Sequence, residues 1–149
     1  MPKEANQPVT DKHPEPATSV FPREPLAGKT VLLVEDERYI ADLLVNWLGV
    51  LGAHTLLAHS GGEGLKILAE NPGRVCVVIA DIRLPDMSGD DMCVQLRALH
   101  PRLPVLLSSG RYQREAEETL IRTGPTGFIQ KPYPLKDVLG ELLKLLAAA

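Results

Sequence analysis

Short apolar runs and amphipathic segments alternate along the chain from about residue 30 onward. Five runs have the length of buried β-strands, and they occupy residues 31–34, 55–58, 75–80, 105–107 and 126–129. The runs are continuous instead of alternating with polar residues, which indicates strands that are covered on both faces. The pattern predicts an α/β fold in which helices wind doubly around a five-stranded parallel sheet.

Each apolar run is followed by a segment with helical spacing. Apolar residues recur every three or four positions within residues 40–51 and 135–146, and the polar segment 114–123 is expected to form a helix with few apolar residues. The third helix has its apolar stripe at Met92, Leu96 and Leu99. Ser60 and Glu63 form a capping box for the second helix, although three glycines in its first turn predict a weak start.

The first 27 residues differ from the rest in composition. Six of the 13 prolines lie there, and proline removes a backbone donor and fixes φ. We therefore expect residues 1–27 to form a flexible proline-rich tail and residues 28–149 to form one domain.

Composition narrows the class of protein. The chain has 149 residues, of which 44% are hydrophobic, so one domain with a core is expected. A formal net charge of -3 argues against a nucleic-acid partner, and no apolar run is long enough for a membrane span. Cys76 and Cys93 both lie in apolar surroundings and read as buried free thiols, which favours a reducing, cytoplasmic location.

Polar residues gather where the predicted strands end. Glu35, Asp36 and Glu37 follow the first strand, Asp81 the third, Ser109 the fourth and Lys131 the fifth. The carboxyl ends of parallel strands lie at one edge of a sheet, so these side chains should converge. Clustered carboxylates repel one another unless a cation such as Mg²⁺ binds, and a lysine can contact a phosphoryl oxygen. The set suits phosphoryl transfer to a carboxylate, although each piece alone has an ordinary structural explanation.

Four motifs, "VLLVEDE", "VVIADIRLPDMSG", "PVLLSSG" and "GFIQKPY", resemble those of the receiver domain of two-component response regulators. Together the motifs cover nearly all of residues 29–149, and their order and spacing are specific to this family. The resemblance implies the flavodoxin-like (βα)5 receiver fold. Within this family, the chain resembles receivers that stand alone or that belong to hybrid histidine kinases.

The resemblance implies a role for each residue at the strand ends. Asp81 would accept a phosphoryl group, and Ser109 and Lys131 would contact it. Mg²⁺ would bind Asp36 and Asp81 directly, Glu35 through water, and the backbone carbonyl of Arg83. Ser109 and Phe128 would form the switch, and Lys131 would precede a cis bond to Pro132. Apart from the resemblance, Arg83 and Arg111 each lie two residues after a proposed site residue, Asp81 and Ser109, and we expect them to shield the acyl phosphate from water.

By the same resemblance, the chain is a phosphoacceptor in a two-component phosphorelay and not an enzyme. A histidine kinase or a histidine phosphotransfer protein would phosphorylate Asp81, and the change would alter an interaction face on the fourth helix, fifth strand and fifth helix. A second receiver, in a homodimer, is a further expected partner. Neither nucleic acid nor a membrane is an expected partner.

Two alternatives remain open at this point. A pseudo-receiver would keep the fold as a binding module without being phosphorylated. A haloacid dehalogenase-like phosphohydrolase also uses an aspartate, Mg²⁺ and a lysine, but that family has a second aspartate where Arg83 stands. The sequence identifies neither the kinase nor the signal.

Overall fold

The computed structural model describes residues 23–110 and 114–148, and these form five strands and five helices in alternation. The elements in chain order are β1 (Thr30–Val34), α1 (Arg38–Val50), β2 (His54–Ala58), α2 (Gly61–Glu70), β3 (Val77–Asp81), α3 (Gly89–Leu99), β4 (Val105–Ser109), α4 (Arg114–Thr123), β5 (Thr126–Gln130) and α5 (Leu135–Ala148). The predicted fold class is therefore confirmed.

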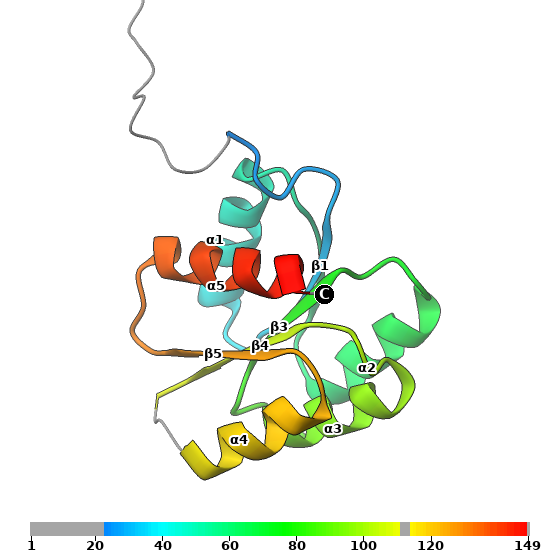
Figure 1. Cartoon of the computed structure of the whole chain (residues 1–149). Helices are drawn as coiled ribbons and strands as arrows, with labels where there is room; N and C mark the ends of the chain where they lie inside the picture. The colour runs from blue at the N-terminus through cyan, green and yellow to red at the C-terminus, as the bar shows by residue number, and fades with distance from the viewer. Residues whose placement is uncertain (1–22, 111–113, 149) are drawn as a thin grey trace, which may run out of the picture.

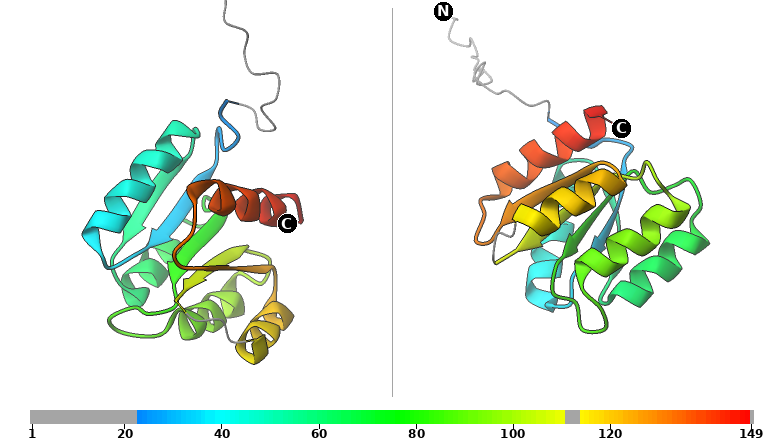
Figure 2. Two further views of the ribbon diagram at one scale, coloured as in Figure 1. Left: turned by 90° about the vertical axis from the view of Figure 1, so that its left-hand side faces the viewer. Right: turned by 60° about the horizontal axis from the view of Figure 1, so that its bottom comes forward.

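All strands are parallel in one sheet of order β2-β1-β3-β4-β5. Helices α1 and α5 cover one face, and α2, α3 and α4 cover the other (Figures 1 and 2). Strand order reverses between β1 and β3, and in such sheets ligands bind beyond the carboxyl ends of the strands at this point.

The continuous apolar runs fill two cores. Along β1, Val31 and Leu33 pack with α1 and α5, whereas Leu32 and Val34 pack with α2, α3 and α4. Successive side chains of a strand point to opposite faces, so a strand that is buried on both sides needs an apolar residue at every position.

Each strand boundary that differs from the prediction does so by one or two residues, and the largest differences are at β3 and β4. Strand β3 begins at Val77 instead of residue 75, because Val77 is the first residue to pair with β1, at Val31. Strand β4 continues through Ser109, since Ser109 still pairs with Gln130 of β5. The ladder therefore includes polar residues that the apolar pattern excluded.

The packed domain begins before residue 28. Leu26, which the sequence placed in the proline-rich segment, is fully buried, and its N–H donates to the carbonyl of Leu51 at 2.9 Å. Gly52 has a φ of +95°, and a Cβ there would lie 3.0 Å from the backbone of Ala27. Residues 1–22 lie outside the described residues.

The stripe predicted for the third helix is partly wrong. Leu99 is 77% exposed, and Arg97 is buried in its place. Arg97 donates to the hydroxyls of Thr123 and Thr126, at 3.1 Å each, and to two backbone carbonyls. A buried guanidinium has to be hydrogen-bonded, and these bonds join α3 to the end of α4 and the start of β5.

Of the two cysteines, Cys93 is buried as expected, but Cys76 is partly exposed.

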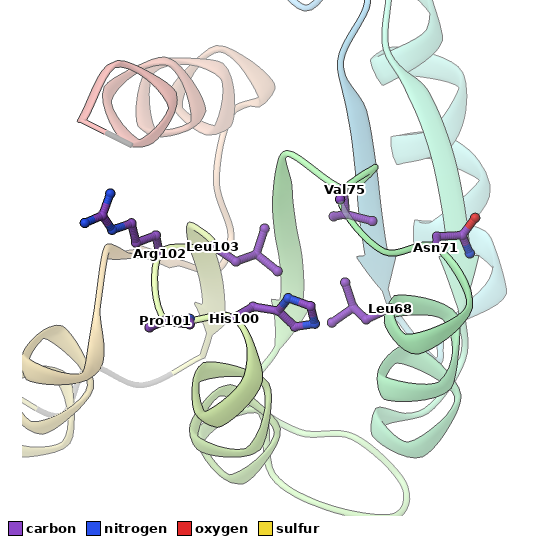
Figure 3. A pocket seen from close by; sticks show the side chains of 8 residues that line it. Leu68, Asn71, Val75, His100, Pro101, Arg102 and Leu103 are labelled. Atoms are coloured by element: carbon purple, nitrogen blue, oxygen red, sulfur yellow. The ribbon is translucent and has the colours of Figure 1, made fainter.

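A hollow of about 340 Å³ lies at the amino-terminal edge of the sheet, between the ends of α2 and α3 (Figure 3). Leu68, Val75 and Leu103 form apolar walls, and His100 lies beside them (Figure 3). Its lining residues lie in or just before the connections that lead into β3 and β4, so this hollow lies at the edge opposite to the acidic strand ends. None of the predicted site residues lines it.

Candidate functional site

Three carboxylates converge at the carboxyl ends of neighbouring strands. Glu35 and Asp36 follow β1, and Asp81 ends the adjacent strand β3. One carboxylate oxygen from each lies within 4.8 Å of the others. In the described part of the chain, this is the one cluster of three potential metal-ligating side chains. The predicted convergence of these residues is therefore observed.

Asp81 is held from two sides. The Lys131 ammonium donates to Asp81 Oδ2 at 2.6 Å, and the backbone N–H of Arg83 donates to Oδ1 at 3.0 Å. Burial alone would lower the pKa of Lys131, but the hydrogen bond and charge of Asp81 outweigh burial and raise it. Lys131 is therefore a cation fixed on the carboxylate that the sequence singled out.

The position of Lys131 follows from the sheet. Its N–H donates to the carbonyl of Ser109 at 2.7 Å, which continues the pairing of β5 with β4. The Lys131–Pro132 bond is cis, as expected.

Glu35 is only 2% exposed. Its carboxylate accepts the N–H of Glu37 at 3.1 Å, and its carbonyl lies 3.1 Å from Nδ1 of His59. Burial raises the pKa of Glu35, and the neighbouring carboxylates of Asp81 and Asp36 raise it further against the opposing effects of Glu37 and Lys131. A bound cation would offset the burial and the like-charge repulsion that disfavour the charged form of Glu35.

An open depression of about 500 Å³ lies over these groups. Asp36, Asp81, Arg83 and Lys131 line it, as the sequence led us to expect, together with Glu37 and Gly110. Glu37 was among the side chains expected to converge, although it had no individual role, whereas Gly110 was not singled out. Gly110 directly follows Ser109, so adjacency to that residue was the available signal. Arg111 lies outside the described residues.

The two predicted switch residues lie on adjacent strands. Ser109 is the last residue of β4 and is partly exposed. Phe128 is not at a strand end but in the middle of β5, opposite Leu107, and packs against the core on the α2–α4 face. Phe128 lies two residues before Gln130, the residue of β5 that pairs with Ser109. Their role as a switch stays a prediction.

The donor set fits Mg²⁺. This ion takes oxygen ligands, keeps several waters and usually rests on one or two carboxylates. The three acidic side chains here offer only oxygen, and the exposed side chain of Asp36 leaves the site open to water. Zinc sites, by contrast, are usually built from cysteine and histidine.

The sequence profile of the response regulator receiver domain matches residues 31–143. The chain is 37% identical over 119 residues to the transcriptional regulatory protein CreB of Escherichia coli, and the match covers 79% of this chain and 51% of CreB. It is 33% identical over 117 residues to the sensor kinase CckA of Brucella abortus, covering 78% of this chain and 12% of CckA. The chain thus spans about half of CreB and a small part of CckA.

Solved structures agree with these matches. A response regulator receiver domain protein from Clostridium thermocellum has a TM-score of 0.75 at 25% identity, covering 80% of this chain and 95% of that one. The receiver domain of the hybrid histidine kinase CckA has a TM-score of 0.66 at 27% identity, covering 78% and 98%. Among the described residues, no helix is long and apolar enough to cross a membrane.

Proposed function

The chain belongs to the receiver-domain family of response regulators, and we propose that it signals through phosphorylation of Asp81. The observation that carries this proposal is the convergence of three carboxylates with Lys131 on Asp81. Receiver domains act as phosphoacceptor modules that interact with kinases or phosphotransfer proteins, and the family binds Mg²⁺ at an acidic pocket.

The transfer is a displacement at phosphorus. A carboxylate oxygen of Asp81 forms the new P–O bond, while the P–N bond to the donor imidazole breaks and its electron pair stays on the nitrogen. Asp81 is 8% exposed and fixed at both oxygens by Lys131 and Arg83, so the nucleophile is positioned before the donor arrives.

Glu35, Asp36 and Asp81, with the carbonyl of Arg83, would hold the Mg²⁺. When bound, the ion neutralises charge on the carboxylates and on the transferring group. The Lys131 ammonium contributes positive charge at Asp81 Oδ2, where it can pair with a phosphoryl oxygen once the acyl phosphate has formed.

The test is intact-mass measurement after incubation with phosphoramidate, with Mg²⁺ or with a chelator. We expect the wild-type protein to gain one phosphoryl group only when Mg²⁺ is present. Asp81→Asn should gain none, whereas the matched control Asp91→Asn, an exposed aspartate on α3, should be labelled normally. Labelling of Asp81→Asn, or labelling in chelator, would refute the assignment. A wild-type protein that is never labelled would instead support the pseudo-receiver alternative.

Membership of the receiver family disfavours the phosphohydrolase alternative. The two readings also predict different kinetics. A phosphohydrolase turns over an aryl phosphate many times, whereas a phosphoacceptor consumes at most about one equivalent before its acyl phosphate decays. Release of aryl alcohol far above one equivalent within that lifetime would favour the hydrolase.

An apolar groove of about 480 Å³ beside Lys131 supports a protein as the phosphoryl donor. Residues Ile40, Leu43 and Leu44 of α1 line it together with Pro132 and Leu135. Leu43 is 48% exposed, which an apolar side chain tolerates more readily where a partner covers it. Leu43→Asp should therefore slow transfer from a purified cognate kinase but not from phosphoramidate. Equal slowing with both donors would contradict docking at this groove.

The proposed output is a changed face on α4, β5 and α5. Phosphorylation would shift a two-state equilibrium there, with Ser109 and Phe128 as the switch. A groove of about 470 Å³ between β5 and α5 includes Phe128 and supports this location. Hydrogen exchange with and without beryllofluoride, a phosphoryl mimic, should change around residues 109–136. A response confined to α1 and α2 would contradict the proposal.

A further inference from the structure

The loop between β3 and α3 reaches across to the start of α2. Asp86 Oδ1 accepts the N–H of Gly61 at 2.8 Å, and Asp86 Oδ2 accepts the N–H of Gly62 at 2.8 Å. These are the first two residues of α2, and such N–H groups have no partner within their own helix. The two amide bonds lower the pKa of Asp86, so the carboxylate is charged at neutral pH.

Glycine at positions 61 and 62 permits this contact. A Cβ at Gly61 would lie 2.5 Å from Cγ of Met87, and a Cβ at Gly62 would lie 3.0 Å from Oδ2 of Asp86. The sequence predicted that these glycines weaken the first turn of α2. The structure shows that they let the Asp86–Met87 segment approach the helix.

The same loop forms one wall of the phosphoacceptor pocket. At its base, Arg83 donates to Asp81 and pairs with Ser88 as an isolated antiparallel bridge. The N–H of Gly89 also donates to the carbonyl of Ile82 at 2.7 Å. Backbone bonds thus join the two arms of the loop at its base, and Asp86 attaches its tip to α2, so a displacement of the tip is passed to Arg83 at the base.

We propose that Asp86 is a positioning residue for the metal site: its carboxylate clamps the loop onto α2 and thereby fixes the Arg83 backbone that contributes to Mg²⁺ binding. The inference rests on the proposed function, because it requires that the cluster binds Mg²⁺. It extends that function by adding α2, an element with no predicted ligand, to the parts that set metal affinity.

The expected effect is moderate. Losing the hydrogen-bond partner of a metal ligand typically weakens affinity by about 10–100-fold. Here only a backbone ligand would be loosened, while the three carboxylates stay in place, so we expect the Mg²⁺ dissociation constant of Asp86→Ala to rise by roughly fivefold. Asp86→Asn should lie between wild type and Asp86→Ala, because its one amide oxygen can accept from only part of the pair.

The experiment is a Mg²⁺ titration of the full chain followed by ¹⁵N–¹H NMR, which reports binding without phosphorylation. The Gly61 and Gly62 amide signals should shift in both Asp86 variants before any metal is added, which shows that the clamp has been released. The Arg83 amide should then respond to Mg²⁺ only at higher concentration than in wild type.

Two controls separate the clamp from other effects. Ser60→Ala removes the hydroxyl that accepts the Glu63 N–H at 3.1 Å, so it weakens the start of α2 without touching the loop. Asp91→Asn removes one negative charge from the exposed first turn of α3. Both should keep the wild-type Mg²⁺ affinity.

An unchanged affinity in Asp86→Ala, or an equal loss in Ser60→Ala or Asp91→Asn, would overturn the inference while leaving the phosphoacceptor proposal intact. If the wild-type chain binds no Mg²⁺, the proposed metal site itself fails, and the clamp fails with it.

Discussion

Replacing Glu35 by glutamine should make the metal-free protein more stable. Glu35 is 2% exposed, and one of its oxygens lies within 4.8 Å of oxygens of Asp36 and Asp81. Two unit charges 4.8 Å apart repel by about 0.9 kcal/mol in bulk water and about 3.5 kcal/mol at an effective dielectric constant of about 20. Attraction to Lys131 offsets part of this repulsion, so we expect a net gain of about 1 kcal/mol in the free energy of unfolding.

The amide is a good replacement because its oxygen can still accept the N–H of Glu37, now 3.1 Å from the carboxylate. A gain of about 1 kcal/mol corresponds to a rise of roughly 3 °C in the melting temperature of a domain of this size. Urea unfolding at pH 7.5 in chelator measures the difference directly. Added Mg²⁺ should stabilise the wild type more than Glu35→Gln, because the variant has lost a carboxylate beside the ion.

The pH dependence gives an independent check. The folded-state pKa of Glu35 is raised above its ordinary value of 4.5, mainly by burial. The stability that this group contributes is therefore fully present below pH 4.5 and is lost as the pH rises through the raised pKa. Without metal, the advantage of Glu35→Gln should grow over that interval. A variant less stable than wild type in chelator, or an advantage independent of pH, would refute the reasoning.

Three further predictions address the proposed roles. Asp36→Asn should weaken Mg²⁺ binding, whereas Lys131→Ala should leave Mg²⁺ affinity unchanged but impair the hydrogen-exchange response to beryllofluoride. Calorimetric Mg²⁺ titration distinguishes the two variants, and equal losses of affinity would mean that the roles are wrongly divided. Gly89→Ala should lower the free energy of unfolding by about 2 kcal/mol, because a Cβ would lie 2.5 Å from the backbone oxygen of Asp81 and the chain itself has to shift. Urea unfolding measures the change in free energy, and an unchanged value would contradict the prediction. Arg83→Ala should speed autodephosphorylation severalfold, a barrier change of about 1 kcal/mol, because the exposed Arg83 lines the pocket mouth where water enters. An acyl phosphate whose lifetime is unchanged or longer in this variant would contradict shielding.

The sequence by itself determined the fold class and the location of the site. Continuous apolar runs occur where a strand is buried on both faces, and the helical stripes between them leave a doubly wound parallel sheet as the consistent arrangement. Glu35, Asp36, Asp81 and Lys131 were predictable as a group because parallel strands bring their carboxyl ends to one edge.

Only the tertiary structure decided which contacts these residues make. Whether Lys131 reaches Asp81 depends on the register of β5 on β4 and on the order of strands, and neither follows from residue types. The burial of Arg97 in place of Leu99 depends on the carbonyls and hydroxyls that the end of α4 and the start of β5 bring to it.

The glycines of α2 show the same limit in local structure. From propensity alone, Gly61 and Gly62 weaken a helix start, since glycine loses the most backbone entropy on folding. Their use appears only when a loop distant in sequence places Asp86 and Met87 against them. Periodicity and propensity are properties of neighbouring residues, whereas a contact between α2 and the loop before α3 exists only once the sheet has set both at the same edge.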